Sequence, residues 1–285
     1  MDRRTFIHLT GLTGIGAASQ SFGQRQADKA PFKIGITDWG LKATCDPKAF
    51  QLAKECGLDG IQLSYVPEHK ERDLTKKEIL DGFVADAKKH EIEVASMAMG
   101  VFNGRPFATT PKAEDWVSQC FDIMTALKQK VVLLAFFGKG DLKNLPDQQK
   151  LVIERLKKLA PLAEKKGVQI GLETWLNKEE HMSIIDGVGS ESVKVYYDTA
   201  NMTKMGYDIH EEMRWLAKKD AICQVHMKEV GNRLGEGKVD FPKVKETLAS
   251  IDYKDWLVIE SGVKDDWKAD ATKNGVYLNK LFNQA

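Results

Sequence analysis

The stretch Gly171-Leu172-Glu173-Thr174-Trp175 decides the fold that we expect for this chain. An apolar segment, residues 168–172, ends here and is followed by the carboxylate of Glu173. Three later apolar segments end in the same way, with residues 195–197 followed by Asp198, 222–225 by His226 and 256–259 by Glu260. The steps from 173 to 198, 198 to 226 and 226 to 260 are 25, 28 and 34 residues. Each step has the length of one strand and one helix in a closed barrel of about 250 residues, so the four side chains are expected to converge.

The rest of the chain alternates apolar segments with helical patterns. Strands are expected at residues 32–37, 61–64, 92–97, 131–136, 168–172, 193–197, 221–225 and 256–259. Helices are expected at residues 46–56, 76–89, 112–127, 147–166, 209–218, 241–250 and 270–282. Strict alternation predicts a parallel sheet with right-handed crossovers. Eight strands predict an α/β fold with a single (β/α)8 TIM barrel as the catalytic domain, residues 32–285.

Composition favours one large domain and a small-molecule substrate. The chain has 285 residues and is 42% hydrophobic, which is enough to bury a large core. Its 42 Lys and Arg balance 41 Asp and Glu without a basic tract, so no nucleic-acid partner is expected. No segment approaches the roughly 20 apolar residues of a membrane span. Dinucleotide-binding and P-loop glycine motifs are missing. A homo-oligomer is compatible with the sequence.

The N-terminus has the pattern of an export signal. Arg3 and Arg4 precede a mildly apolar, Gly-rich run, residues 9–18, which resembles a twin-arginine signal. Residues 1–26 are therefore expected to be signal and linker, with removal near residues 19–26 leaving about 260 residues. This predicts a periplasmic or other extracytoplasmic protein. A frayed basic tail is the alternative.

Glu173, Asp198, His226 and Glu260 together are a ligand set for one hard divalent cation. Such a set suits Mn²⁺, Mg²⁺ or Co²⁺ and can accept Zn²⁺. Taken singly, each residue has an ordinary alternative: a glutamate can pair with a lysine, Asp198 can cap a helix or turn, and His226 can be a core histidine. Their positions at the ends of four consecutive strands favour the metal site.

The same residues carry a family resemblance. With Gly57-Leu58-Asp59-Gly60-Ile61-Gln62-Leu63 and His226-Met227-Lys228-Glu229, they resemble the xylose isomerase-like barrel superfamily, in particular the sugar phosphate isomerases/epimerases. The resemblance runs from about residue 32 to the C-terminus. It implies that the four ligands bind one divalent metal, and that Glu173 and Glu260 are also the catalytic acid/base pair. Asn201 departs from the histidine, and Gln62 from the glutamate, that many members have at these positions.

The expected chemistry follows from such a site. A metal that chelates a carbonyl and its neighbouring hydroxyl acidifies the C–H between them by stabilising an enediolate, so a carboxylate can remove the proton. Return of the proton to the opposite face makes an epimerase, and return to the adjacent carbon makes an isomerase. We therefore expect a metal-dependent isomerase or epimerase of a free or phosphorylated sugar or keto-sugar. The alternatives are a dehydratase or lyase of a keto-sugar or inosose, an endonuclease IV-like phosphodiesterase and a non-catalytic sugar-binding barrel.

Seven further residues are expected to bind the sugar substrate. Lys228 faces the same side of its strand as His226 and can stabilise an oxyanion. Arg233 is expected to hold a polar or anionic end of the substrate, with a solvated loop arginine as the alternative. Aromatic stacking or polar contacts with the sugar are expected from the remaining residues, which are Trp39, Trp175, Asn201, Asn177 and Gln62.

Overall fold

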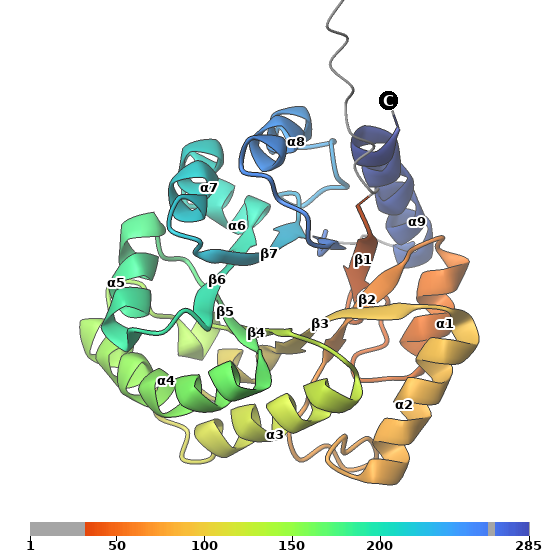
Figure 1. The fold of residues 1–285 in the computed structure, drawn as a ribbon. Coiled ribbons are helices and arrows are strands. Elements are labelled where there is room, and N and C mark those ends of the chain that lie inside the picture. The colour runs from red at the N-terminus through yellow and green to blue at the C-terminus, as the bar shows by residue number, and fades with distance from the viewer. Residues whose placement is uncertain (1–31, 262–265, 285) are drawn as a thin grey trace, which may run out of the picture. The chain divides into compact units, whose positions relative to one another are not determined.

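Eight parallel strands close into a barrel in the computed structural model, which describes residues 32–261 and 266–284 (Figure 1). The strands follow one another around the barrel in chain order, and β8 closes onto β1. This confirms the predicted (β/α)8 TIM barrel. The predicted signal, residues 1–26, lies outside the described residues, so export stays a prediction.

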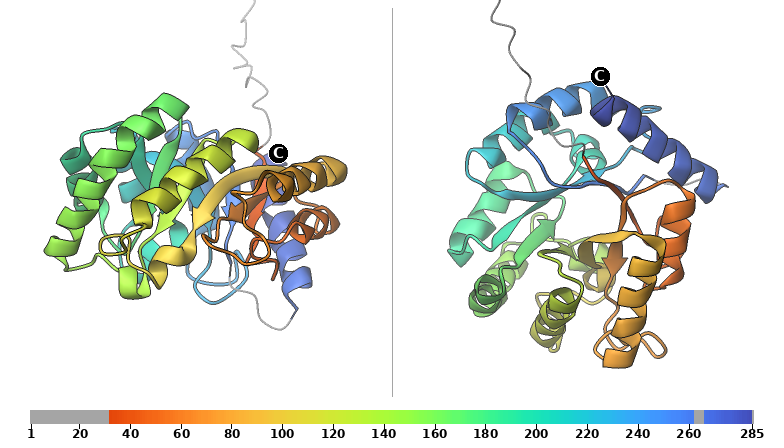
Figure 2. Two further views of the ribbon diagram at one scale, coloured as in Figure 1. Left: turned by 90° about the horizontal axis from the view of Figure 1, so that it is seen from below. Right: turned by 45° about the vertical axis from the view of Figure 1, so that its right-hand side comes forward.

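The helices lie outside the ring of strands, as the views in Figure 2 show. The strands are β1 (Ile34–Thr37), β2 (Gly60–Ser64), β3 (Glu93–Met99), β4 (Val131–Ala135), β5 (Gln169–Glu173), β6 (Val193–Asp198), β7 (Ile222–Met227) and β8 (Leu257–Ile259). The helices are α1 (Lys48–Glu55), α2 (Lys77–His90), α3 (Ala113–Ala126), α4 (Pro146–Lys166), α5 (Lys178–Val188), α6 (Thr199–Lys204), α7 (Ile209–Ala217), α8 (Phe241–Ser250) and α9 (Trp267–Leu278). Short turns η1 (Gly100–Asn103) and η2 (Gly138–Gly140) follow β3 and β4, and a π-helical turn, η3 (Asn279–Asn283), follows α9.

Every predicted strand is present, but α5 and α6 were not predicted. Helix α5 begins with a capping box. The Asn177 side chain accepts a hydrogen bond from the Glu180 backbone N–H, and the Glu180 carboxylate accepts one from the Asn177 N–H, both at 2.8 Å. The helix ends at Gly189, whose φ of 75° lies in the left-handed region. The spacing of asparagine and glutamate is a recognised signal for a helix start, and it gives Asn177 a structural role where the sequence predicts a substrate contact.

Apolar side chains form two cores, one on each side of the barrel wall. The larger lies between the strands and the surrounding helices. The smaller lies inside the barrel and contains Ala98, Val131, Leu133, Ala135, Tyr196 and Cys223. Polar residues share that interior with it, among them the fully buried Gln62 and Gln224. The barrel interior is therefore less apolar than is usual for this fold.

Gly171 leaves room for its neighbours inside the barrel. A Cβ atom at this position would lie 2.7 Å from Cys223 Sγ and 3.0 Å from Tyr196 Cβ. We expect Gly171→Ala to lower the free energy of unfolding by about 1–3 kcal/mol, the usual cost of overpacking, as measured by urea denaturation. Gly82→Ala is the matched control, because a Cβ there meets nothing within 4 Å. The control should gain up to about 1 kcal/mol from helix propensity. Equal stability of Gly171→Ala and wild type would contradict this account.

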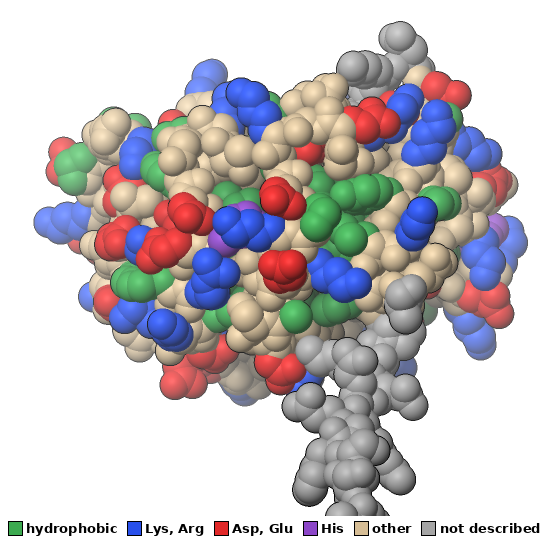
Figure 3. All heavy atoms as spheres, turned by 90° about the horizontal axis from the view of Figure 1, so that it is seen from above, with side chains coloured by type: hydrophobic (Ala, Val, Ile, Leu, Met, Phe, Trp, Pro, Cys, Tyr) green, Lys and Arg blue, Asp and Glu red, His purple; other side chains and the backbone are tan. Residues whose placement is uncertain are grey.

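Acidic and basic side chains are interspersed over the face shown in Figure 3. This distribution agrees with the near-neutral composition, and large fields of one sign are what a nucleic-acid partner would need. In the part of the chain that the structure describes, none of the helices has the length and hydrophobicity of a membrane span.

Candidate metal centre

Four consecutive strands deliver the predicted ligands to one point. Glu173 ends β5, Asp198 ends β6, His226 lies in β7 and Glu260 follows β8. The register helps to align them, because Asp198 and His226 are direct partners across β6 and β7. One ligand atom from each residue lies within 4.8 Å of the others, and this is the single group of its kind within residues 32–261 and 266–284. The expected convergence is therefore present in the fold.

The Nδ1 atom of His226 faces the three carboxylates. It lies 3.1 Å from Glu173 Oε1, 3.1 Å from Glu260 Oε2 and 3.7 Å from Asp198 Oδ2. Asp198 Oδ2 and Glu260 Oε2 are buried and accept no hydrogen bond among the described residues; their contacts with His226 Nδ1 and Lys228 Nζ are ion pairs. A buried carboxylate oxygen without a hydrogen bond is costly, and a divalent cation satisfies such oxygens. The donor set therefore fits the predicted metal.

The two carboxylate oxygens of Asp198 face different partners. Its Oδ1 atom accepts a hydrogen bond of 2.6 Å from the Asn201 backbone N–H and so caps α6. Its Oδ2 atom stays directed at the cluster, 3.4 Å from Lys228 Nζ. The cap holds the carboxylate in place, and it also brings the Asn201 side chain beside Glu173.

Lys228, Asn201 and Trp39 contact the two glutamates in different ways. Lys228 Nζ lies 2.9 Å from Glu260 Oε2, and Trp39 Nε1 donates to Glu260 Oε1 at 3.3 Å. Asn201 Nδ2 donates to Glu173 Oε1 at 3.3 Å, and Asn201 Oδ1 accepts from Lys228 Nζ at 3.2 Å. The charge of Lys228 therefore stabilises the Glu260 carboxylate. Among these three residues, Glu173 is contacted only by the neutral amide of Asn201.

The surrounding charges drive the pKa values of the two glutamates apart. Burial and the charge of Glu260 raise the pKa of Glu173 to about 7. Burial also acts to raise the pKa of Glu260, but the charges of His226 and Lys228 hold it well below its usual range. Burial acts to lower the pKa of His226, whereas Glu260 and Glu173 raise it well above its usual value. Without a cation, the cluster therefore retains protons that metal binding would displace.

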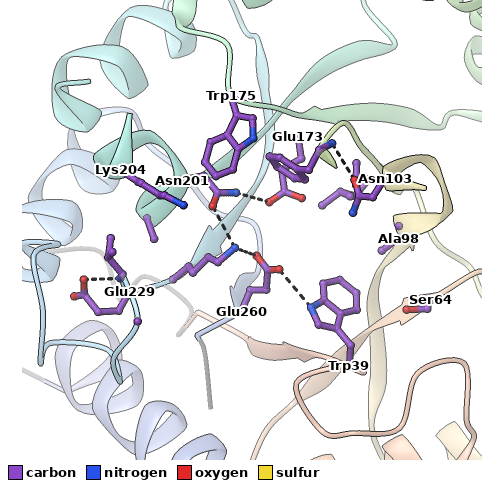
Figure 4. A pocket seen from close by; sticks show the side chains of 18 of the residues that line it. Trp39, Ser64, Ala98, Asn103, Glu173, Trp175, Asn201, Lys204, Glu229 and Glu260 are labelled. Atoms are coloured by element: carbon purple, nitrogen blue, oxygen red, sulfur yellow. Dashed lines mark hydrogen bonds and ion pairs between the residues drawn. The ribbon is translucent and has the colours of Figure 1, made fainter. Parts of the chain in front are cut away.

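Glu173 and Glu260 line a cavity of about 570 Å³, which is within the range of small-molecule sites. Trp39 and Trp175 lie on opposite sides of the two glutamates in Figure 4. The rest of the wall is partly apolar and includes Ala98, Leu133, Ala135 and Phe137. The cavity therefore offers charged groups beside apolar surface, as an amphipathic ligand requires.

Residues 50–278 match the family model described as "Xylose isomerase-like TIM barrel". The chain belongs to this family. Its membership confirms the resemblance inferred from the sequence. A search of curated proteins found no match.

Solved structures similar to this member of the xylose isomerase-like TIM barrel family include three epimerases. D-allulose 3-epimerase from Methylomonas sp. is 17% identical, with a TM-score of 0.71 over 88% of this chain and 98% of the other. L-ribulose 3-epimerase is 20% identical, with a TM-score of 0.71 over 87% of this chain and 93% of the other. A 3-keto-D-glucoside 4-epimerase from E. coli is 15% identical, with a TM-score of 0.69 over 87% of this chain and 99% of the other. At these identities the likeness concerns the fold.

The structure brings four of the seven predicted substrate residues to the cavity of this family member. Trp39, Trp175, Asn201 and Lys228 line it. The other three do not.

Arg233 pairs with Asp270 of α9 and with Glu236, so its charge is used outside the cavity. Asn177 caps α5. Gln62 is fully buried, and its Oε1 atom lies 2.9 Å from His226 Nε2. The geometry therefore supports structural roles for these residues in place of the predicted substrate contacts.

Five polar residues of the cavity wall were missed by the sequence analysis: Thr44, Ser64, Asn103, Lys204 and Glu229. Ser64 ends β2, so the rule that located the metal ligands would have found it. Glu229 is buried, and its Oε1 atom accepts hydrogen bonds from the backbone N–H groups of Val230, Lys238 and Val239. It thereby folds the loop after β7 back on itself, a role that no local sequence signal reveals.

Proposed function

We propose that the protein is a divalent-metal-dependent isomerase or epimerase of a free or phosphorylated sugar or keto-sugar. The observation that carries this proposal is the convergence of Glu173, Asp198, His226 and Glu260 beside a single cavity. The family and the epimerases among the structural neighbours support the substrate class.

Three carboxylates and the Nδ1 atom of His226 would hold the cation. When bound, it would act as a Lewis acid on a substrate carbonyl and its neighbouring hydroxyl, which acidifies the C–H bond between them. Lys228 and Trp39 keep Glu260 ionised and oriented, so it is prepared to accept a proton. Glu173 is the second carboxylate beside the cavity and would give or take the proton on the opposite face of the substrate.

The cavity wall assists in two ways. Trp39 and Trp175 present ring surfaces on either side of the glutamates, where a sugar face can stack. Phe137 packs edge-on against Trp175, with ring centroids 4.9 Å apart, and fixes its position. The apolar part of the wall limits water around the reacting carbon and strengthens the electrostatic contacts.

A deuterium-exchange screen tests the proposal. Protein stripped with a chelator and reloaded with Mn²⁺ is incubated in D₂O with a panel of free and phosphorylated keto-sugars. We expect deuterium at the carbon beside the carbonyl, together with a new epimer or aldose detected by NMR. Loss of water would indicate the dehydratase alternative, and binding without any exchange would indicate a sugar-binding barrel. Cleavage of an abasic DNA duplex without sugar exchange would overturn the proposal.

The endonuclease alternative needs further metal ligands close to the cluster. Two histidines that could be thought to serve it, His69 and His90, lie elsewhere: His69 Nδ1 accepts backbone hydrogen bonds from Glu71 and Arg72, and His90 is the last residue of α2. Neither belongs to the ligand group. The described residues therefore favour a site for one metal.

A further inference from the structure

A column of hydrogen-bonded polar side chains runs through the barrel interior and ends at His226. It starts at the exposed Asp255, just before β8, and continues through Gln224, Tyr196 and Gln62. Gln224, Gln62 and His226 are fully buried, and Tyr196 is 1% exposed. Interiors of such barrels are usually filled by branched apolar side chains, so this column calls for a reason.

The donor and acceptor atoms of each link in the column lie within hydrogen-bond distance. Gln224 Nε2 donates to Asp255 Oδ1 at 3.0 Å and to the Ala95 carbonyl at 3.2 Å. The Tyr196 hydroxyl donates to Gln224 Oε1 at 2.7 Å and accepts from Gln62 Nε2 at 2.9 Å. Gln62 Oε1 lies 2.9 Å from His226 Nε2.

The direction of the hydrogen bonds in the column follows from the end at Asp255. The Ala95 carbonyl can only accept, and so can the Asp255 carboxylate, so they require the Nε2 atom of Gln224. Gln224 Oε1 must then face Tyr196, and the Tyr196 proton is committed to it. The oxygen of Tyr196 is left to accept, which requires the Nε2 atom of Gln62.

The hydrogen bond between Gln62 and His226 determines which ring nitrogen of the histidine carries the proton. With Gln62 Nε2 turned toward Tyr196, Gln62 Oε1 faces His226 and can only accept. His226 must therefore carry a proton on Nε2. Its other nitrogen, Nδ1, is the atom that faces Glu173, Asp198 and Glu260.

We propose that this column selects the tautomer of His226 that binds metal. Gln62 is the positioning residue that does so. The proposal rests on the metal site of the proposed function but not on the reaction. With a proton on Nε2, a neutral His226 has its lone pair on Nδ1, directed at the cluster. Without the acceptor of Gln62, Nε2–H would be buried and unpaired, and the ring would favour a proton on Nδ1, donated to Glu173. That proton would block the ligand position.

Metal affinity of the purified protein tests the proposal by calorimetric titration with Mn²⁺. Partners that orient metal-binding histidines typically contribute about 10–100-fold to affinity, and we expect a loss of this size in Gln62→Met. Ser96→Ala is the matched control, because Ser96 Oγ accepts from the same Gln62 nitrogen at 2.9 Å and also hydrogen-bonds Tyr196, but it is not a link between Asp255 and His226. It should change the affinity less than about 3-fold, since Tyr196 still sets the direction of the amide.

Two further variants separate positioning from packing. Gln62→Glu keeps an acceptor for His226 and should retain most of the affinity that Gln62→Met loses. Tyr196→Phe leaves Gln62 in place but frees its amide to turn, so it should lose more affinity than Ser96→Ala. Urea denaturation of the metal-free proteins checks that each variant is folded. If Gln62→Met is not folded, the metal affinities of Tyr196→Phe and Ser96→Ala still test the role of the column.

The ¹⁵N spectrum of histidine-labelled protein loaded with Zn²⁺ gives a readout of the bound form. We expect a protonated Nε2 and a metal-bound Nδ1 for His226 in the wild type. Absence of metal binding to wild type would contradict the metal site itself. Tight binding in wild type with an unchanged affinity in Gln62→Met, or binding through Nε2, would overturn only the role of the column.

Discussion

Glu260→Gln is expected to abolish net turnover of the sugar, with a loss of about 10²–10⁴-fold at saturating metal, the usual contribution of a positioned proton-transfer group. The amide cannot take a proton from the substrate. It also removes the charge that Lys228 Nζ contacts at 2.9 Å. Turnover is measured by NMR of the sugar at several Mn²⁺ concentrations, so that weaker metal binding is separated from loss of the proton carrier.

Deuterium exchange sharpens this experiment. If Glu173 and Glu260 serve opposite faces of one carbon, each removes the proton of one epimer only. Glu260→Gln should then stop exchange from one epimer, and Glu173→Gln should stop exchange from the other. Glu236→Gln is the matched control, since Glu236 is an exposed partner of Arg233 outside the cavity, and it should leave both rates unchanged. Turnover by Glu260→Gln at more than a tenth of the wild-type rate would contradict the assignment.

The barrel and its ligand cluster could be predicted because both depend on local patterns. A parallel strand delivers its last residue to one end of the barrel, so a charged residue after an apolar run identifies that end. This holds for Glu173, Asp198 and Glu260. The same reasoning leaves Asp198 as either a cap or a ligand, and the structure shows one oxygen capping α6 and the other directed at the cluster.

Contacts between distant strands could not be predicted in the same way. Gln62 is expected at the substrate because it stands where many members of the family have a glutamate, yet its Oε1 atom contacts Nε2 of His226, which is 164 residues away. Arg233 looked free in its loop, but its partner Asp270 lies in α9. Asn177 is different, because its capping box is local and was open to prediction. The contacts of these three side chains therefore divide into two set by the tertiary fold and one set by a local sequence signal.

Loading the stripped protein with metal is expected to raise its melting temperature substantially. A ligand at 1,000 times its dissociation constant stabilises the folded state by about 4 kcal/mol. At about 2–4 °C per kcal/mol for a domain of this size, the shift is roughly 8–16 °C. Differential scanning calorimetry with and without Mn²⁺ measures it. Asp198→Asn should lose most of the shift, whereas Asp240→Asn, which alters a cap of α8, should keep it. An equal shift in Asp198→Asn and wild type would place the cation elsewhere.

The gain from metal should also grow with pH. In the metal-free protein the pKa values of Glu173 and His226 are raised, so each contributes stability below its unfolded pKa and loses it as the pH rises through the folded value. Metal ligands must be deprotonated, so the loaded form does not gain from these protons. Raising the pH from 6 to 8 therefore weakens the metal-free form and favours the loaded one. Titration calorimetry in two buffers with different ionisation enthalpies should show release of about one proton or more per metal. A melting-temperature shift that is independent of pH, with no proton released, would mean that the cation leaves this buried charge cluster untouched.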